Sequence, residues 1–208
     1  MIDKLHFGPG SNWIKPDSTW GSIDADSARA DIVVDFNKFK TLEFSDQTIL
    51  CIYGSHIFEH INIFNAPKVF KECYRVLVFG GILRIVLPDV RKSIENYIKG
   101  NRDYVLFKRR EELLKSIMGY EKISLFELLK SDFISPTGQH EILGQESLAH
   151  QNAWDYEAIC LDLCRAGFDK NKIVQSEFQQ SSSSYFSFEG TYPSEANEYE
   201  RSLYIEAI

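Results

Sequence analysis

Hydrophobic and polar positions follow two alternating patterns along the first half of the chain. Continuous apolar runs at Thr48 to Tyr53 and Ile82 to Leu87 predict strands that are covered on both faces, as in a parallel sheet. Between them, from Asn65 onward, apolar residues recur at spacings of three and four, which predicts an amphipathic helix that stops at Gly80-Gly81. Shorter apolar runs predict further strands at Lys4 to Phe7, Trp20 to Ile23 and Asp31 to Asp35.

The second half of the chain continues this alternation and closes it. Helical spacing resumes at Val90 to Ile98, at Asp103 to Ile117 and at Asp155 to Ala166, where Asp155 is the expected N-cap. Ile173 to Phe178 and Ser202 to Ala207 alternate as the two strands of an antiparallel pair. The sequence thus predicts one α/β domain over residues 1–208, with a Rossmann-like, doubly wound, mostly parallel seven-stranded sheet, a closing antiparallel strand and three αβα layers.

One segment does not fit either pattern. Between Gly119 and Asn152 the periodicity weakens, and glycine, serine, proline and histidine accumulate. We expect an irregular cap or insert over the sheet at about residues 119–152, because long segments without secondary structure in a compact domain usually cover a functional site.

A glycine turn and a carboxylate mark the edge of the sheet where a ligand is expected. In open α/β sheets, ligands bind at the carboxyl ends of the strands, close to the point where the strand order reverses. Gly8-Pro9-Gly10 follows the first predicted strand, and Asp24 follows the second, where a carboxylate suits a ribose diol. Trp13 replaces the third glycine of a G-x-G-x-x-G motif, which argues against a dinucleotide. Taken alone, the turn fits an ordinary loop glycine pair equally well.

Several segments, in order, resemble those of one known family. The chain is similar to the class I S-adenosylmethionine-dependent methyltransferases, in the compact branch called methyltransferase type 11. The resemblance covers nearly the whole chain and rests on LHFGPGSNW from Leu5, WGSIDAD from Trp20, ADIVVDF from Ala30, SHIFEH from Ser55, CYRVLVFGGILRIVLPD from Cys73, AWDYEAICLDLCRAGF from Ala153 and RSLYIEA from Arg201.

The resemblance implies which residues bind the cofactor, S-adenosyl-L-methionine. It puts the glycine turn at the methionine part, a carboxylate at the ribose, an acidic and an aromatic residue at the adenine, and two polar residues at the edge nearest the substrate. In that order these are Phe7, Gly8, Pro9 and Gly10; Asp24; Asp35 and Phe36; Ser55 and His56. Pro9 departs from the family's usual cysteine and removes a backbone N–H that could face the cofactor carboxylate.

Histidines are the candidates for acid–base chemistry, because imidazole titrates near neutrality. His56 directly follows the fourth predicted strand and is the candidate catalytic residue, with a structural role as the alternative. His60 fits a capping or core histidine better, and His140 and His150 fall in the expected insert. An apolar acceptor pocket or ordinary core could be formed by Trp13, Tyr53, Tyr120, Trp154, Tyr185 and Phe186.

Composition and charge narrow the classes of partner. A net charge of -7 and the absence of a long basic run argue against nucleic acid. No signal peptide and no long apolar span are visible, so we expect a cytoplasmic protein without a membrane span. The four cysteines lie in apolar periodic segments and are expected to be buried thiols. No metal site is predicted, because carboxylates and histidines do not cluster at ligand spacing.

The resemblance implies an enzyme that transfers a methyl group from S-adenosylmethionine to an unidentified acceptor. A small molecule or a glycan intermediate is the expected acceptor, because the chain lacks a basic surface and an appended recognition domain. Two alternatives remain open: a non-catalytic cofactor-binding or scaffold protein descended from a methyltransferase, and a nucleotide-dependent oxidoreductase. The sequence predicts no oligomeric state.

Overall fold

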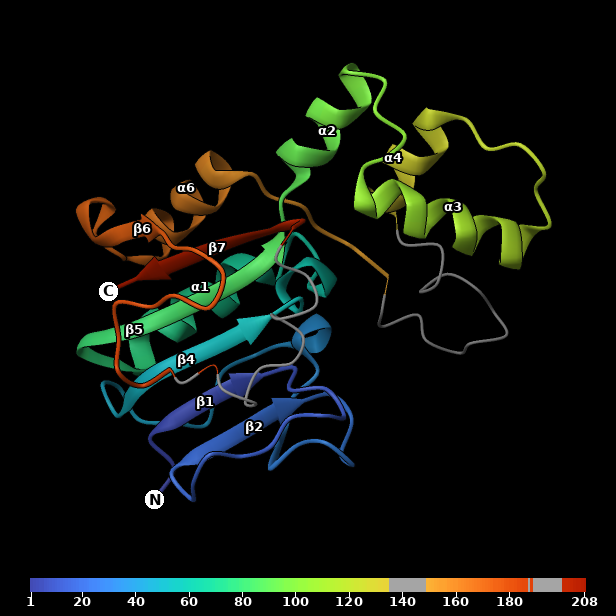
Figure 1. Ribbon diagram of the computed structural model, residues 1–208. Helices are drawn as coiled ribbons and strands as arrows, with labels where there is room; N and C mark the ends of the chain where they lie inside the picture. Colours follow the sequence, from blue (N-terminus) through green and yellow to red (C-terminus); the bar gives the residue numbers. More distant parts are fainter. Residues whose placement is uncertain (135–148, 187, 189–199) are drawn as a thin grey trace.

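The computed structural model describes residues 1–134, 149–186, 188 and 200–208, and its centre is one mixed sheet (Figure 1). Seven strands lie in the order β3-β2-β1-β4-β5-β7-β6, and the first five in the chain are parallel. β7 is antiparallel to both of its neighbours. The strands are β1 (Lys4–Phe7), β2 (Trp20–Asp24), β3 (Ile32–Val33), β4 (Ile49–Ser55), β5 (Leu77–Pro88), β6 (Ile173–Gln175) and β7 (Ser202–Ala207). The predicted sheet is confirmed.

One face of the sheet is covered by two helices that pack against each other, α1 (Ala66–Val76) and α6 (Tyr156–Ala166). Val69, Phe70 and Cys73 form the buried stripe of α1 and belong to the main core. Asp155 caps α6 by accepting a hydrogen bond from the backbone N–H of Ala158, as predicted.

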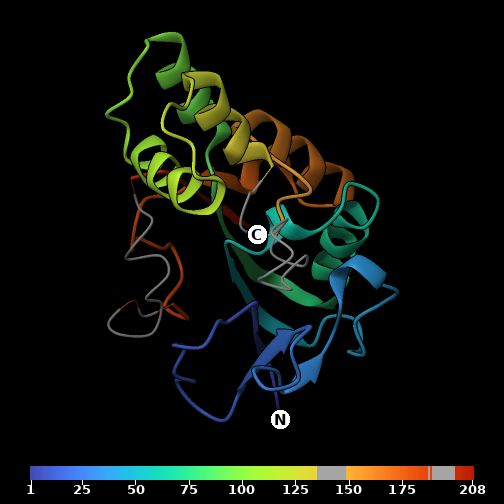
Figure 2. The ribbon, with the colours of Figure 1, turned by 90° about the vertical axis from the view of Figure 1, so that its right-hand side faces the viewer.

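Irregular segments cover the other face and pack aromatic side chains on it. Trp20, Tyr53 and Phe186 form a second buried cluster with Trp13 packed against it. Figure 2 shows α1 and α6 on one side of the sheet and the segment after β6 on the opposite side. The sheet is therefore buried on both faces, as the continuous apolar runs predict.

Three further helices lie beyond the carboxyl end of β5 (Figure 1): α2 (Val90–Ile98), α3 (Val105–Met118) and α4 (Leu125–Phe133). They have a small core of their own, made by Phe107, Leu114, Ile123, Leu128 and Leu129. We call these three helices the cap.

The cap corrects part of the expected irregular insert. Residues 125–133 are helical, because Ser124 and Glu127 form a reciprocal capping box that starts α4. The short helix buries only part of one face, so its periodicity is too brief to stand out in the sequence. Residues 135–148 of the insert, with His140, lie outside the described residues.

Gly80-Gly81 does not stop a helix. α1 ends at Val76, and β5 begins at Leu77 and runs through both glycines. Gly80 has a φ of 78° and Gly81 lies close to the carbonyl of Leu50, so the pair lets β5 bend beside β4, where their register shifts.

A buried ion pair fastens the antiparallel side of the sheet. Arg84 of β5 and Glu206 of β7 pair at 2.8 Å between Nη1 and Oε1, with 0% and 1% of their side chains exposed. Arg84 also donates to the carbonyl oxygens of Glu177 and Gln180. The guanidinium thus ties the segment after β6 to the sheet.

Replacing Glu206 with Ala should lower the free energy of unfolding by about 3 to 5 kcal/mol, because it removes a buried carboxylate that pairs with the buried guanidinium of Arg84. Urea denaturation measures this change. Glu95→Ala is the matched control, because it removes an exposed helical pair with Arg91 and should cost less than about 1 kcal/mol. Equal losses in the two variants would contradict this role of the buried pair.

Candidate functional site

The register of three parallel strands brings the candidate residues to one level. Phe7 of β1 pairs with Ile23 of β2 on one side and with Gly54 of β4 on the other. The next residues, Gly8, Asp24 and Ser55, therefore lie side by side at the carboxyl edge. The strand order reverses between β1 and β4, which is where ligands bind in open α/β sheets.

The turn after β1 depends on glycine. Gly8 has a φ of 60° and Gly10 a φ of 68°, a region that residues with a Cβ rarely adopt. A Cβ on Gly8 would lie 3.0 Å from the side chain of Ile57, whereas one on Gly10 would meet nothing within 4 Å. The Gly8 amide donates to the carbonyl of Ile23 at 2.8 Å, and Pro9 supplies no amide. The backbone is thus held close to β2 and β4.

Two predicted acidic residues lie at consecutive strand ends. Asp24 ends β2, and its Oδ1 accepts a hydrogen bond from the amide of Asp26 at 2.9 Å. Asp35 caps the short 3-10 helix η1 (Phe36–Lys38) by accepting from the amide of Asn37. Phe36 is buried, and its ring centroid is 5.0 Å from that of Phe7. The Asp35 carboxylate therefore caps η1, and Phe36 packs against Phe7.

His56 has a left-handed backbone and two side-chain partners. Its φ is 52°, which costs a residue other than glycine about 1 to 3 kcal/mol. Its amide bonds to the carbonyl of Val86, its Nε2 lies 2.8 Å from Ser202 Oγ, and its Nδ1 lies 3.1 Å from Glu59 Oε1. The neighbouring Ser55 Oγ is buried and has no partner among the described residues.

Glu59, His56 and Ser202 form a chain of carboxylate, imidazole and hydroxyl. Such a chain activates a serine nucleophile when the hydroxyl is accessible. Ser202 is 1% exposed and lies within β7, so a substrate does not reach it. The chain instead fixes the orientation of the imidazole, with both ring nitrogens of His56 engaged.

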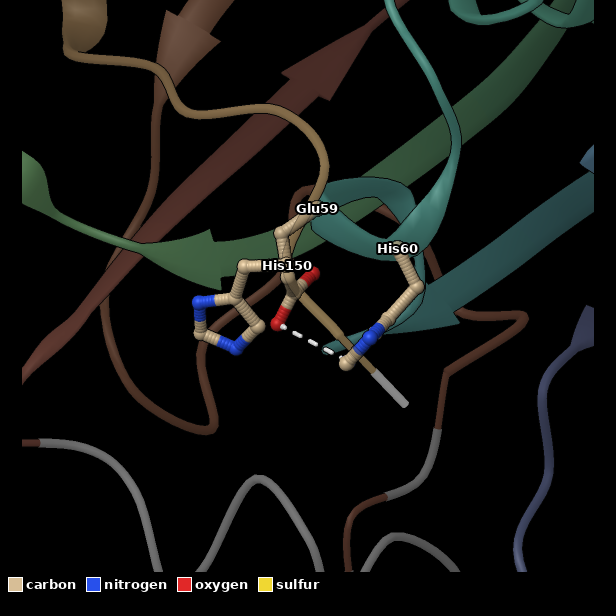
Figure 3. Close-up of side chains that lie close together, drawn as sticks. All are labelled: Glu59, His60 and His150. Carbon is tan, nitrogen blue, oxygen red and sulfur yellow. Dashed lines mark ion pairs between the residues drawn. The ribbon is translucent and has the colours of Figure 1, made fainter. Parts of the chain in front are cut away.

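The structure assembles a cluster that sequence spacing missed (Figure 3). Glu59 and His60 belong to the 3-10 helix η2 (Phe58–His60), and His150 lies in the segment before α6. One ligand atom from each of the three side chains lies within 4.8 Å of the others. The expectation that carboxylates and histidines do not cluster is wrong here, because only the fold brings His150 to η2. A Glu-His pair followed by a distant histidine was the available signal.

Burial and the imidazoles act in opposite directions on the Glu59 carboxyl. Burial raises the pKa of Glu59. The His56 hydrogen bond and the charges of His56, His60 and His150 outweigh this effect and lower the pKa to about 2. Burial lowers the pKa of His150, with the charge of Glu59 opposing that shift. Glu59 is therefore an ionised carboxylate inside the protein.

The candidate aromatic residues do not gather in one pocket. Trp13, Tyr53 and Phe186 share the second face of the sheet. Trp154 packs in the main core on the other face, and Tyr120 is exposed. The ordinary-core interpretation fits most of this set.

A cleft of about 490 Å³ lies at the opposite edge of the sheet, where β5 begins and β7 ends. Gln47, Leu77 and Ile208 are among the residues that line it. It lies away from the strand-order reversal and from every residue of the candidate site, so it does not mark that site.

The fold is similar to that of known methyltransferases. A structure of an S-adenosylmethionine-dependent methyltransferase from Archaeoglobus fulgidus matches 99% of this chain and 85% of its own length, with a TM-score of 0.52 and 12% identity. A chain from the complex of the Haloferax volcanii Trm112 methyltransferase activator with a proposed methyltransferase matches 99% of this chain and 81% of its own, with a TM-score of 0.51 and 11% identity. The chain has the class I methyltransferase fold.

The remaining comparisons add no family assignment. No protein-family model matches the chain, and no curated protein matches its sequence. Among the described residues, no helix is long and apolar enough to cross a membrane. Cys51 and Cys73 are buried as predicted, whereas Cys160 and Cys164 are half-buried, and all four are free thiols.

The left-handed turn yields a test of its packing. Gly8→Ala should lower the free energy of unfolding by about 1 kcal/mol more than Gly100→Ala, because both positions have positive φ but only Gly8 faces a close side chain. Thermal and urea denaturation of the two variants measure the difference. Equal destabilisation of the two variants would contradict this prediction and indicate that the Ile57 side chain moves to make room for the new methyl group.

Proposed function

We propose that this chain binds S-adenosyl-L-methionine at the carboxyl edge of β1, β2 and β4 and transfers its methyl group to an acceptor. The observation that carries the proposal is the common level of Gly8, Asp24 and Ser55 at the reversal of strand order. The shared fold with S-adenosylmethionine-dependent methyltransferases supports it. The motifs LHFGPG and SHIFEH favour the type 11 branch within that fold class.

The residues at this edge fit the parts of the cofactor. Gly8 allows the left-handed turn after β1, which keeps the backbone at the edge where the methionine part is proposed to lie. Asp24 is half-buried at the end of β2, where its carboxylate accepts hydrogen bonds from a ribose diol. The buried, unpartnered Oγ of Ser55 faces the same level and offers a donor and an acceptor. Asp35 and Phe36 follow β3, at the end of the site where we place the adenine.

The bound cofactor supplies a methyl group on a sulfonium, and transfer to the acceptor is an in-line displacement. The chain's task is to hold the two reactants at attack distance and keep water away. Packing of η2 against the Gly8 turn and the hydrogen bonds of His56 give this edge a fixed shape. Both ring nitrogens of His56 are hydrogen-bonded, so we propose that His56 shapes the edge nearest the acceptor and serves as base only for an acceptor that takes the place of Ser202 at Nε2.

A small molecule or a glycan intermediate is the proposed acceptor. The net charge of -7 disfavours a polyanion, and the cap forms a separate layer of helices beyond the end of β5, next to the proposed site. Substrate choice in this fold lies in such attached segments rather than in the sheet.

Isothermal titration with S-adenosylmethionine, S-adenosylhomocysteine and NAD tests the cofactor. We expect the two sulfur nucleotides to bind and NAD not to bind. Asp24→Ala should weaken their binding by about 1 to 3 kcal/mol, the usual effect of removing a charged hydrogen-bond partner. Asp103→Ala is the matched control, because its carboxylate is exposed on the cap and should leave the affinity unchanged.

The other outcomes separate the alternative functions. Binding of NAD alone would favour an oxidoreductase, and an unchanged affinity in Asp24→Ala would contradict the ribose assignment. If no nucleotide binds, Pro9→Cys decides the cause, because it restores the missing amide at the turn. Binding restored by Pro9→Cys would indicate a scaffold protein that has lost its cofactor.

A further inference from the structure

We propose that Glu59, His60 and His150 bind a divalent transition-metal ion of the Zn²⁺ class. The three side chains come from η2 and from the segment before α6, and the Glu59 carboxylate lies between the two imidazole rings in Figure 3. This site does not depend on the proposed methyl transfer.

The hydrogen bonds of the two histidines direct the same ring nitrogen into the cluster. His60 Nδ1 lies 3.3 Å from the carbonyl oxygen of Ala149, and His150 Nδ1 lies 2.6 Å from that of Asp132. A carbonyl only accepts, so each Nδ1 carries a proton, and in the neutral imidazole Nε2 is then the nitrogen with the lone pair. Metal-binding histidines are usually oriented in this way, with the second ring nitrogen donating to a backbone carbonyl.

These nitrogens lie around a buried carboxylate whose oxygens are not all hydrogen-bonded among the described residues. His60 Nε2 lies 3.9 Å from Glu59 Oε1, which is too long for a hydrogen bond. Glu59 Oε2 is buried without a partner among the described residues, and so is Asp132 Oδ1. Glu59, Asp132 and His150 line one small cavity. Buried carboxylate oxygens without donors are costly, and a cation bound between them and the imidazoles removes that cost.

The donor set selects the class of ion. Two imidazole nitrogens and one carboxylate suit Zn²⁺ and its neighbours, whereas Mg²⁺ and Ca²⁺ prefer oxygen donors. A tetrahedral ion with bonds of about 2.1 Å holds its ligand atoms about 3.4 Å apart. The three ligand atoms lie within 4.8 Å of one another, so binding requires the most distant pair to close by up to about 1.4 Å. Three protein ligands leave a fourth position for water or a substrate oxygen.

The cluster contacts the proposed cofactor edge through one residue. Glu59 Oε1 accepts from His56 Nδ1, and His56 follows the end of β4.

Titration of chelator-treated protein with Zn²⁺ and Co²⁺ tests the site. We expect one equivalent to bind, visible absorption bands from bound Co²⁺, and a higher melting temperature with Zn²⁺. Glu59→Gln and His150→Ala should each weaken binding about 100-fold or more and abolish the Co²⁺ bands. Glu95→Gln, an exposed carboxylate on α2, should bind like the unchanged protein.

Two measurements keep the result decisive. Circular dichroism establishes that each variant is folded, and the melting shift of the unchanged protein tests the site even where a variant fails to fold. No binding to the unchanged protein would overturn the site and leave a buried water as the partner of Glu59. Undiminished binding in folded Glu59→Gln and His150→Ala would overturn it as well. Nucleotide binding is measured on the metal-free protein. Its result is independent of the metal titration, so the two experiments distinguish this inference from the proposed methyl transfer.

Discussion

The common register of β1, β2 and β4 is the constraint on which the rest of the site depends. β1 lies in the middle and pairs with both neighbours through Phe7, so three strands end at one level. A slip of one residue in either pairing would turn every side chain of that strand to the other face. It would also separate Gly8, Asp24 and Ser55. The apolar core that fixes the register therefore also fixes the ligand-facing edge.

Close packing under that edge makes it rigid. Gly54 has no room for a Cβ, which would lie 2.6 Å from the ring of Phe58, and Gly8 is similarly close to Ile57. The chain therefore leaves β4 through a tight turn, in which His56 has a left-handed backbone. Hydrogen bonds to Val86, Ser202 and Glu59 offset the cost of that conformation. An edge held from beneath by packing and from the sides by hydrogen bonds changes shape little when a ligand binds.

The sequence predicted the parts whose signal is local. All seven strands and the helices with several turns of regular spacing were visible in the hydrophobic pattern. The prediction failed where one local feature fits two structures: Gly80-Gly81 is typical of a helix end, but here it lets a strand bend. α4 was missed because one capping box and two turns make a weak signal. The cluster of Glu59, His60 and His150 was missed, since its only local signal is the Glu59-His60 pair and no spacing rule joins His150 to that pair.

Glu59 lies where η2 meets the segment before α6. Its carbonyl accepts hydrogen bonds from the amides of Gln151 and Asn152, so the backbone of η2 holds the segment that carries His150. The carbonyl of Asp132, at the end of α4, holds the ring of His150 from the other side. The imidazole of His150 is thus positioned by the end of α4 as well as by the segment that η2 holds. An ion bound as proposed would therefore connect η2 with the end of α4, because His150 contacts both elements.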